Sequence, residues 1–349
     1  MSDVVDIPPA TWAALPPWLD ASAAGALAER ARWPHALLIT GPRGLGKRLL
    51  ALHFARVLLC ETPRADGAAC GTCVGCALVE RRNHPDLRLI EPITYDEDGN
   101  PTPVDTITVE PIRDLIDFAL LSSHRGGAKV AVIAPADALN AAAANALLKT
   151  LEEPPPQTYL LLVSHRAGRL PATIISRCRR LPVAMPDPVV ASAWLSGLGV
   201  PNSERLLAQA GGAPLLAVAL ADANVQQDRD WWLGELARPE RLSPVALGAR
   251  LEAAPKDERK KALADATYWL LTWTADLAAV AAGGAPRFHP DRGDALAGLA
   301  PRVARVPLFR YYRSLLRQRA LLTHPLQPRL VAESLLFDYR MLFARSKEN

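Results

Sequence analysis

A glycine-rich loop between an apolar segment and a helical segment is the feature that most limits how this chain can fold. Residues 36–40 are ALLIT, and residues 41–47 are GPRGLGK, which matches the pattern G-x-x-x-x-G-K. Glycines in such a loop let backbone N–H groups close around phosphate oxygens, and the lysine reaches the β- and γ-phosphates. The sequence therefore predicts a phosphate-binding loop in an α/β domain, with ligand contacts from Gly41, Gly44, Gly46 and Lys47.

Two positions that a magnesium–ATP site requires hold unsuitable residues. The residue after the loop lysine is normally Ser or Thr, whose hydroxyl binds Mg²⁺, but here it is Arg48. The acid that helps to hold the metal should follow the apolar strand 129–133, where Ala134 and Pro135 stand instead. Asp137 comes later and is interpreted as an N-cap-region residue of the next helix. The sequence predicts that ATP hydrolysis is lost, whereas nucleotide binding at the loop stays open.

Short apolar runs alternate with segments of helical periodicity through the first half of the chain. The predicted strands are 36–40, 86–90, 129–133 and 159–163, and the predicted helices are 49–59, 109–121 and 140–153. Residues 91–107 are rich in Asp, Gly and Pro and are predicted to form an exposed loop. Strands that alternate with helices indicate a mostly parallel sheet. Pro182, Pro186 and Pro188 mark the end of this domain.

Only helical patterns follow residue 188. They cover 189–195, 203–210 and 214–223, and then longer segments such as 262–282 and 310–322. The sequence therefore predicts an α/β domain followed by a small and then a larger helical domain, so the fold class is α/β plus all-α.

Four of the five cysteines form a compact pattern, C-x9-C-x2-C-x2-C. Four thiolates can close a tetrahedral, structural zinc site, with Cys60, Cys70, Cys73 and Cys76 as the ligands. An iron–sulfur cluster is the main alternative, but the residues after Cys76 lack the usual x3-C-P continuation. His84 precedes a proline and is interpreted as a capping or packing residue, and Cys178 as a small apolar one.

Arginines suggest two further contacts. Arg177 follows an apolar segment near the end of the α/β domain, where a guanidinium can neutralise charge on a neighbouring subunit's γ-phosphate. A surface arginine in a salt bridge is the simpler interpretation of this residue taken alone. A second, basic stretch is favoured as a solvated helix face over a DNA contact; it consists of Arg302, Arg305, Arg310, Arg313, Arg317 and Arg319.

Charge and hydropathy exclude other classes of protein. The chain has 40 basic and 36 acidic residues, a net charge of +4, which is too small to indicate nucleic-acid binding by itself. No apolar stretch approaches the roughly 18 residues of a membrane span. The acidic start at residues 1–6 lacks the features of a signal peptide. A cytoplasmic protein without a membrane partner is predicted.

With these motifs in place, the chain closely resembles the δ′-type clamp-loader subunits of bacterial DNA polymerase III, which are AAA+ proteins. The resemblance covers most of the chain, and the block 145–155 together with 176–178 is highly specific to clamp-loader subunits. The segments that carry it are Pro17-Trp18-Leu19, 35–38, 58–60, His84-Pro85-Asp86, 126–130, 145–155 and Ser176-Arg177-Cys178.

This resemblance implies three domains and a role. The domains are a RecA-like AAA+ domain at 1–185 with a zinc module at 60–76, a small helical lid at 186–226, and a helical collar at 227–349. The implied role is a stator without ATPase or polymerase activity, in a hetero-pentameric ring with gamma/tau motor subunits and a delta subunit. That ring loads the sliding clamp on primed DNA. Arg177 would be the trans-acting arginine finger, the four cysteines the zinc ligands, and 41–47 a vestigial phosphate loop.

Several positions separate this chain from a motor subunit. Ala213-Pro214-Leu215 stand where a motor subunit places its nucleotide-sensing arginine, and Ser164 occupies the sensor-1 position without metal ligands beside it. The loop nevertheless keeps Lys47, so residual ATP or ADP binding stays open. Two alternatives are an ATP-hydrolysing motor subunit and a zinc-bearing DNA-binding module.

Overall fold

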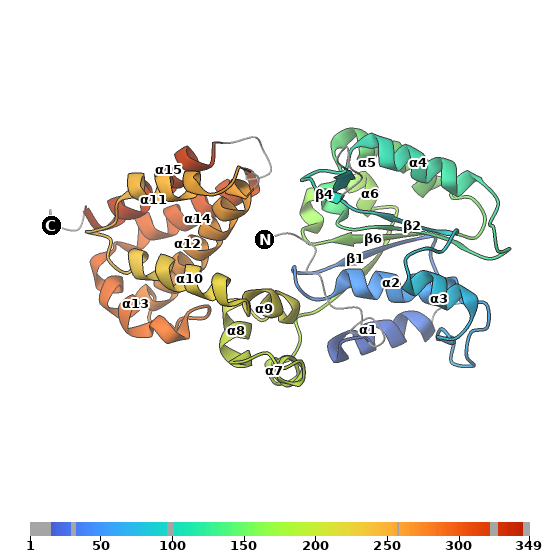
Figure 1. The fold of residues 1–349 in the computed structure, drawn as a ribbon, viewed down its shortest axis with the longest axis horizontal. Coiled ribbons are helices and arrows are strands. Elements are labelled where there is room, and N and C mark those ends of the chain that lie inside the picture. Colours follow the sequence, from blue (N-terminus) through green and yellow to red (C-terminus); the bar gives the residue numbers. More distant parts are fainter. Residues whose placement is uncertain (1–14, 29–32, 96–100, 257, 322–326, 345–349) are drawn as a thin grey trace. The chain divides into compact units, whose positions relative to one another are not determined.

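A computed structural model describes residues 15–28, 33–95, 101–256, 258–321 and 327–344. The chain divides into two compact units, Val4–Trp194 and Leu195–Asn349 with Met1–Asp3. The first unit is α/β and the second is helical in its described part (Figure 1), which confirms the predicted fold class. The finer division into a 186–226 lid and a 227–349 collar stays a prediction.

A five-stranded, fully parallel sheet forms the centre of the first unit. The strand order is β2-β5-β6-β1-β7. The strands are β1 (Ala36–Thr40), β2 (Leu87–Ile90), β5 (Lys129–Ile133), β6 (Thr158–Ser164) and β7 (Arg179–Pro182). The first four confirm the predicted strands. The sequence did not predict β7, because this short edge strand has the sequence Arg-Arg-Leu-Pro and its residues are mostly exposed.

Helices cover both faces of this sheet (Figure 1). One face is covered by α2 (Lys47–Leu58), with α1 (Pro17–Ala28) and α3 (Val74–Glu80) packed against that helix. The other face is covered by α4 (Val109–Leu120), α5 (Ala141–Glu152) and the short α6 (Ala172–Ile175). The predicted helices 49–59, 109–121 and 140–153 are confirmed as α2, α4 and α5.

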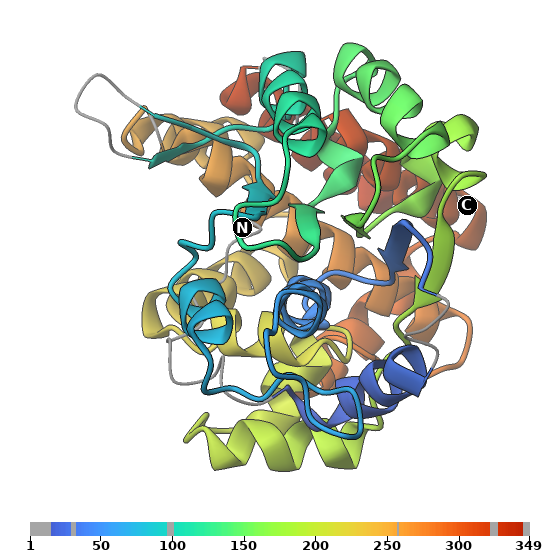
Figure 2. The same ribbon diagram turned by 90° about the vertical axis from the view of Figure 1, so that its right-hand side faces the viewer.

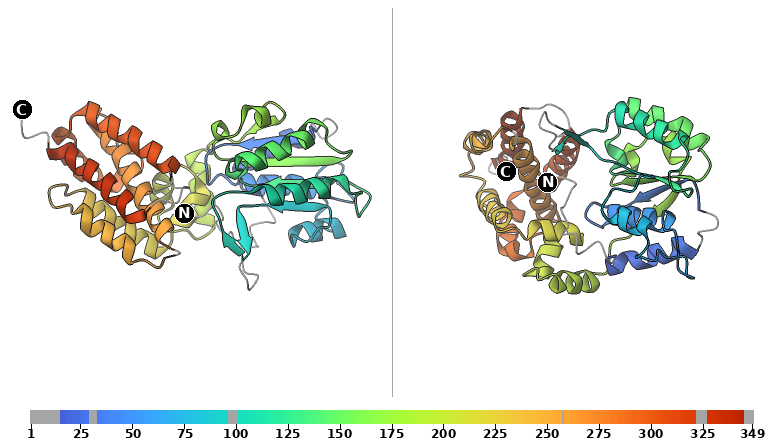
Figure 3. Two further views of the ribbon diagram at one scale, coloured as in Figure 1. Left: turned by 90° about the horizontal axis from the view of Figure 1, so that it is seen from above. Right: turned by 45° about the vertical axis from the view of Figure 1, so that its right-hand side comes forward.

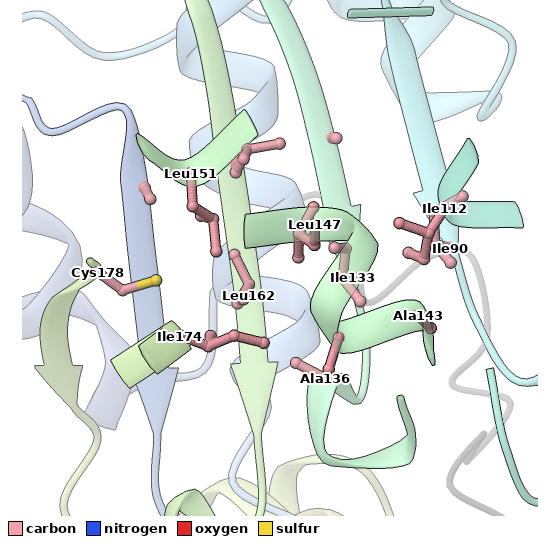
Figure 4. Close-up of a cluster of buried hydrophobic side chains, with 14 of the residues drawn as sticks. Ile90, Ile112, Ile133, Ala136, Ala143, Leu147, Leu151, Leu162, Ile174 and Cys178 are labelled. Carbon is pink, nitrogen blue, oxygen red and sulfur yellow. The ribbon is translucent and has the colours of Figure 1, made fainter. Parts of the chain in front are cut away.

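The layer between the sheet and α4–α6 is a continuous apolar core. Leu147 and Leu151 of α5 pack with Leu162 of β6 and Ile133 of β5 (Figure 4). Cys178 lies in the same cluster, in agreement with its interpretation as a small apolar residue, and its burial raises the thiol pKa to about 11. This core connects the sheet to the helices on that face.

The segment 91–107 is not the simple loop that the sequence predicts. β3 (Ile93–Tyr95) and β4 (Pro101–Pro103) form an antiparallel pair that extends from the end of β2 (Figure 2). The sequence Ile-Thr-Tyr has high strand propensity, and the prolines are tolerated because a two-stranded pair consists only of edges. The Asp, Gly and Pro residues of this segment, which are typical of turns, led to the prediction of a loop instead of a strand pair.

The second unit is built from helices around α12 (Figure 3). Trp269 and Trp273 of α12 are buried, and the Trp273 indole donates to the Tyr339 hydroxyl at 2.9 Å. The helices are α7 (Pro188–Gly197, which crosses the unit boundary), α8 (Ser203–Gln209), α9 (Pro214–Leu220), α10 (Ala223–Leu236), α11 (Pro244–Ala253), α12 (Arg259–Ala281), α13 (Gly293–Leu299), α14 (Arg305–Leu321) and α15 (Pro328–Ala344). They include all the helices predicted after residue 188, apart from residue 322, which lies outside the described part. None of the described helices has the length and apolar character of a bilayer span.

A buried arginine joins helices of the second unit. Arg229 of α10 donates from Nη2 to Asp291 at 2.7 Å and lies 3.1 Å from Nδ1 of His289. Burial and the Arg229 charge lower the pKa of His289 to about 3, so this imidazole is neutral at pH 7. Its Nε2 lies 3.0 Å from the Thr272 hydroxyl of α12. This network connects α10 and α12 to the segment that precedes α13.

The core of the first unit makes a testable prediction. Leu147→Ala should lower the free energy of unfolding of the α/β unit by about 2–5 kcal/mol, because it removes buried contacts and leaves a cavity. Urea denaturation followed by circular dichroism measures the change. The control is Leu120→Ala on α4, where the side chain is 70% exposed and the expected change is below about 0.5 kcal/mol. Equal losses in both variants would contradict the packing described here.

Candidate functional site

The glycine loop has the setting that its motif predicts. It follows β1, and α2 begins at Lys47. Gly44 and Gly46 have φ values of 81° and 84°, in the left-handed region that glycine adopts without strain. Gly46 is also the N-cap residue of α2, so the loop directs backbone N–H groups and the positive end of this helix toward one place.

Groups of the chain itself contact the loop. The Lys47 side chain is only 2% exposed, and its Nζ donates to the Pro42 carbonyl at 2.6 Å. The Trp18 indole of α1 donates to the Leu45 carbonyl at 2.9 Å. Trp18 also makes an edge-to-face contact with Trp194 of α7, with ring centroids 5.0 Å apart. The loop is therefore held in shape by internal contacts.

The carboxyl end of β5 lacks an acid next to the loop. Ala134 and Pro135 follow the strand, as the sequence predicts. Asp137 accepts a hydrogen bond from the His165 amide at 2.8 Å. The N-cap of α5 is Asn140, whose side chain accepts from the Ala143 amide, so the interpretation of Asp137 as an N-cap-region residue of that helix is wrong. Asp137 instead joins the end of β5 to the end of β6.

Ser164 lies at the same edge of the sheet. It is the last residue of β6 and stands beside Thr40, the residue that precedes the loop. The side chain is fully buried, and its hydroxyl accepts from the Arg166 amide at 3.2 Å. Ser164 therefore lies next to the residue that precedes the glycine loop, with a backbone partner for its hydroxyl, and its sensor-1 role stays a prediction.

Arg177 lies just after α6, where its side chain is partly exposed. The guanidinium forms an ion pair with Glu152, the last residue of α5, and Nη1 donates to the Thr173 carbonyl at 3.0 Å. The exposed fractions of the two side chains are 33% and 47%, so solvent reaches both partners. The simpler interpretation of Arg177, an arginine in a surface salt bridge, describes this contact within the isolated chain.

Strand polarity separates Arg177 from the glycine loop. β7 pairs in parallel with β1, and Arg179 stands beside Leu37 whereas Pro182 stands beside Thr40. The loop follows Thr40, but Arg177 precedes β7, so the two lie at opposite edges of the sheet. From Arg179 to Pro182 the strand advances by three residues, or about 10 Å, and Arg177 lies before its start. Arg177 is thus placed away from the phosphate loop of its own chain.

The four predicted cysteine ligands come together. Their sulfur atoms all lie within 4.8 Å of one another, with Cys60–Cys73 at 3.9 Å and Cys70–Cys76 at 4.0 Å. These separations exclude disulfides, whose sulfurs are about 2.05 Å apart. They are close to the roughly 3.8 Å between neighbouring sulfurs of a tetrahedral site with zinc–sulfur bonds of about 2.3 Å. The cysteines therefore fit a four-coordinate metal ion.

Hydrogen bonds stabilise the thiolate form of one cysteine in this cluster, and a thiolate favours a cation. The Thr62 hydroxyl and the amides of Thr72 and Cys73 donate to Cys70, and these bonds lower its pKa to about 5. Burial instead raises the pKa of Cys76 to about 12. A coordinated dication deprotonates such a thiol outright, so metal binding and thiolate formation support each other.

The cysteine cluster is tied to the α/β unit through a second set of contacts. Glu61, next to Cys60, pairs with Arg125, whose Nε donates to Oε1 at 2.6 Å. The segment around Arg125 is fixed by Asp86, which accepts from the Ser123 hydroxyl and from the amides of His124 and Arg125. Burial would raise the pKa of Asp86, but these hydrogen bonds outweigh the effect of burial and lower the pKa.

His84 is buried and accepts from the Asp86 amide, in agreement with a capping role.

The basic stretch near the C-terminus behaves as a solvated face. Arg302 pairs with Glu240 at 3.2 Å. The remaining arginines of the stretch are exposed on α14; they are Arg305, Arg310, Arg313, Arg317 and Arg319.

The comparisons with known proteins agree with this geometry. Residues 24–187 match a family model described as "DNA polymerase III, delta subunit". The predicted resemblance to δ′-type clamp-loader subunits is confirmed over this segment, which contains the glycine loop, the four cysteines and Arg177.

Individual relatives have matching names. A protein of Pseudomonas aeruginosa named DNA polymerase III subunit delta' is 43% identical over 208 residues, which cover 58% of this chain and 60% of that protein. The Escherichia coli protein of the same name is 37% identical over 219 residues, 61% of this chain and 63% of its own length. The chain thus matches less than two thirds of the length of these relatives.

More distant similarities extend to other subunits. DNA polymerase III subunit tau of Salmonella typhimurium is 38% identical over 144 residues, 41% of this chain and 21% of that protein. A solved structure of a DNA polymerase III, gamma subunit-related protein from Thermotoga maritima covers 92% of this chain and 99% of its own chain, at 17% identity and a TM-score of 0.43.

Sequence reasoning identified the principal residues but not their partners. Glu152 lies in the block 145–155, and nothing in its spacing indicates that it pairs with Arg177. Asp86 contributes to the resemblance, yet its hydrogen bonds with the amides of His124 and Arg125 appear only in the fold. Long-range pairs of this kind depend on the tertiary structure.

The cysteine cluster leads to a prediction about metal content. Elemental analysis of the purified protein should find about one zinc ion per chain, without visible absorbance, because four thiolates fill the coordination sphere of a colourless d¹⁰ ion. Cys73→Ser should lose most of this zinc, since it removes a ligand.

The matched control is Cys178→Ala, which removes the cysteine that lies outside the cluster and should retain the zinc. A brown protein that contains iron would contradict the zinc assignment, and so would full zinc occupancy in Cys73→Ser.

Proposed function

We propose that this chain acts as a δ′-type subunit of a bacterial DNA polymerase III clamp loader. In this role it is a non-hydrolysing stator, and Arg177 is a trans-acting finger that contacts ATP bound to a neighbouring motor subunit. The names of the relatives and the family match over residues 24–187 support the assignment to this complex.

The observation that carries the proposal is the position of Arg177 at the edge of the sheet opposite to the glycine loop. From there the guanidinium has to act on a phosphate that another subunit holds. Arg177 is partly exposed, and its partner Glu152 is a surface residue, so exchange of the carboxylate for a phosphate requires little desolvation.

The absence of an acid directly after β5 supports the loss of hydrolysis. Ala134 has no side chain that can bind Mg²⁺ or polarise water, and Asp137 is engaged with the His165 amide. The alternative, a motor subunit, predicts ATP hydrolysis by the purified chain that Lys47→Ala abolishes. No steady phosphate release is expected from the chain alone.

The partners follow from the same assignment. They are the gamma/tau motor subunits and a delta subunit in a hetero-pentameric ring, with the sliding clamp and primed DNA as indirect partners. The three-domain division, with the lid at 186–226 and the collar at 227–349 as the part that joins the ring, belongs to this proposal. So do zinc as the metal at the four cysteines and the cytoplasm as the location.

Reconstitution of the ring tests the finger. Arg177→Ala should lower the DNA-stimulated ATPase activity of the assembled complex by about 10³-fold or more at the affected site, because it removes charge stabilisation from the transition state. Phosphate release and clamp loading are measured on rings whose assembly is verified by gel filtration.

Arg180→Ala serves as the control, since Arg180 is an exposed arginine three positions away on β7. It should load clamps at the normal rate. Normal clamp loading by intact rings that contain Arg177→Ala would exclude the finger role.

A further inference from the structure

A carboxylate stands at the end of β2, beside the position where the acid of a magnesium site is missing. β2 and β5 pair in parallel, Ile90 stands beside Ile133, and the Ala134 amide donates to the Ile90 carbonyl at 2.9 Å. Glu91 follows Ile90 directly, so it lies level with Ala134 on the neighbouring strand, about 4.8 Å away in the sheet direction. The acid absent after β5 is therefore present one strand further along the same edge.

This carboxylate contacts the residue that replaces the metal-binding hydroxyl. Arg48 Nη2 donates to Glu91 Oε2 at 2.8 Å, and Nε lies 2.6 Å from Oε1. The side chains are 20% and 10% exposed, so most of both groups is withdrawn from solvent. Two contacts between planar groups fix their geometry more firmly than a single contact does.

The pair joins the start of α2 to the end of a strand, as a metal ion does in a phosphate-loop ATPase, although the strand here is β2, the neighbour of β5. There, Mg²⁺ bridges the hydroxyl after the loop lysine and an acid at a strand end. Here, the start of α2 and the end of β2 are bridged by a guanidinium and a carboxylate. A guanidinium has no lone pair for a metal, and its charge repels a dication.

We propose that the Arg48–Glu91 pair takes the place of Mg²⁺ and makes the glycine loop a magnesium-independent site. Any phosphate ligand that the loop accepts is then a metal-free polyphosphate such as a nucleoside diphosphate. Its phosphates must compete with the Pro42 carbonyl for Lys47, so binding is weak. This inference adds to the proposed loss of ATP hydrolysis, and it rests on the proposed function only in the assignment of the glycine loop. It does not depend on the role of Arg177.

Nucleotide titrations of the full chain test this proposal, with fluorescent ADP as the probe in buffer that contains either Mg²⁺ or EDTA. For the unaltered chain, Mg²⁺ should not strengthen ADP binding, whether that binding is weak or undetectable. Arg48→Thr restores a hydroxyl and releases Glu91, so ADP should bind about tenfold more tightly with Mg²⁺ than with EDTA. Circular dichroism verifies that the variant is folded.

Glu91→Gln provides a second test that keeps the guanidinium. Arg48 then lacks its carboxylate, so metal-free ADP and pyrophosphate should bind several-fold more tightly than to the unaltered chain, still without help from Mg²⁺. Glu61→Gln is the matched control, because it breaks the ion pair with Arg125 and leaves Arg48 in place. It should bind like the unaltered chain.

Three results would overturn the proposal. They are tighter ADP binding with Mg²⁺ than with EDTA in the unaltered chain, a folded Arg48→Thr without Mg²⁺ dependence, and a gain of Mg²⁺ dependence in Glu91→Gln. These titrations use the isolated chain, so failure of the finger experiment in the ring would leave their outcome unaffected. Magnesium-supported ATP turnover by the isolated chain would refute both proposals.

Discussion

Parallel strand pairing is the constraint that places the glycine loop, Glu91, Ser164 and Arg177 within the first unit. Because β2, β5, β6, β1 and β7 all run in one direction, their carboxyl ends meet at one edge of the sheet. The glycine loop, Glu91 and Ser164 lie at that edge. Arg177 and Glu152 lie near the amino ends. The polar groups of the candidate site therefore fall into two sets, one at each end of the strands.

The two arginine–glutamate pairs at these edges differ in burial, and this difference suits different roles. Arg177 and Glu152 are a third to a half exposed, and exposed pairs contribute only about 0–1 kcal/mol, so the guanidinium can leave its partner at little cost. Arg48 and Glu91 are mostly buried. Loss of one partner of a fully buried pair costs about 3–5 kcal/mol, and this pair falls between the two limits. The Arg177–Glu152 pair can therefore separate at little cost, whereas the Arg48–Glu91 pair contributes to the stability of the fold.

The sequence was sufficient where a local pattern determines the structure. Apolar runs located four of the five strands of the main sheet, and the cysteine spacing located a cluster whose sulfurs meet. It failed where the signal is weak or non-local. β7 carries no apolar run, the turn residues of 91–107 concealed a strand pair, and the N-cap of α5 is Asn140 although Asp137 also suits such a position.

The pairs that give the candidate site its chemistry could not be predicted at all. Glu91 lies 43 positions from Arg48 along the chain, and Asp86 lies 38 positions from the His124 amide. Such contacts follow from strand order and register, which no spacing rule provides. The order β2-β5-β6-β1-β7 places Glu91 beside Ala134. Only this strand order shows that a carboxylate lies next to the position where the acid after β5 is missing.

Retention of Lys47 does not by itself indicate ATP binding, because the loop has a structural role without a ligand. The Lys47 ammonium is buried against the Pro42 carbonyl, and the Leu45 carbonyl accepts from Trp18 of α1. Removal of the lysine would remove this donor from the Pro42 carbonyl and would also remove the buried contacts of the lysine side chain. A loop that binds its own chain stays ordered when nucleotide is absent. The proposed stator role would require this property, since the shape of such a subunit must not change with the nucleotide cycle of its neighbours.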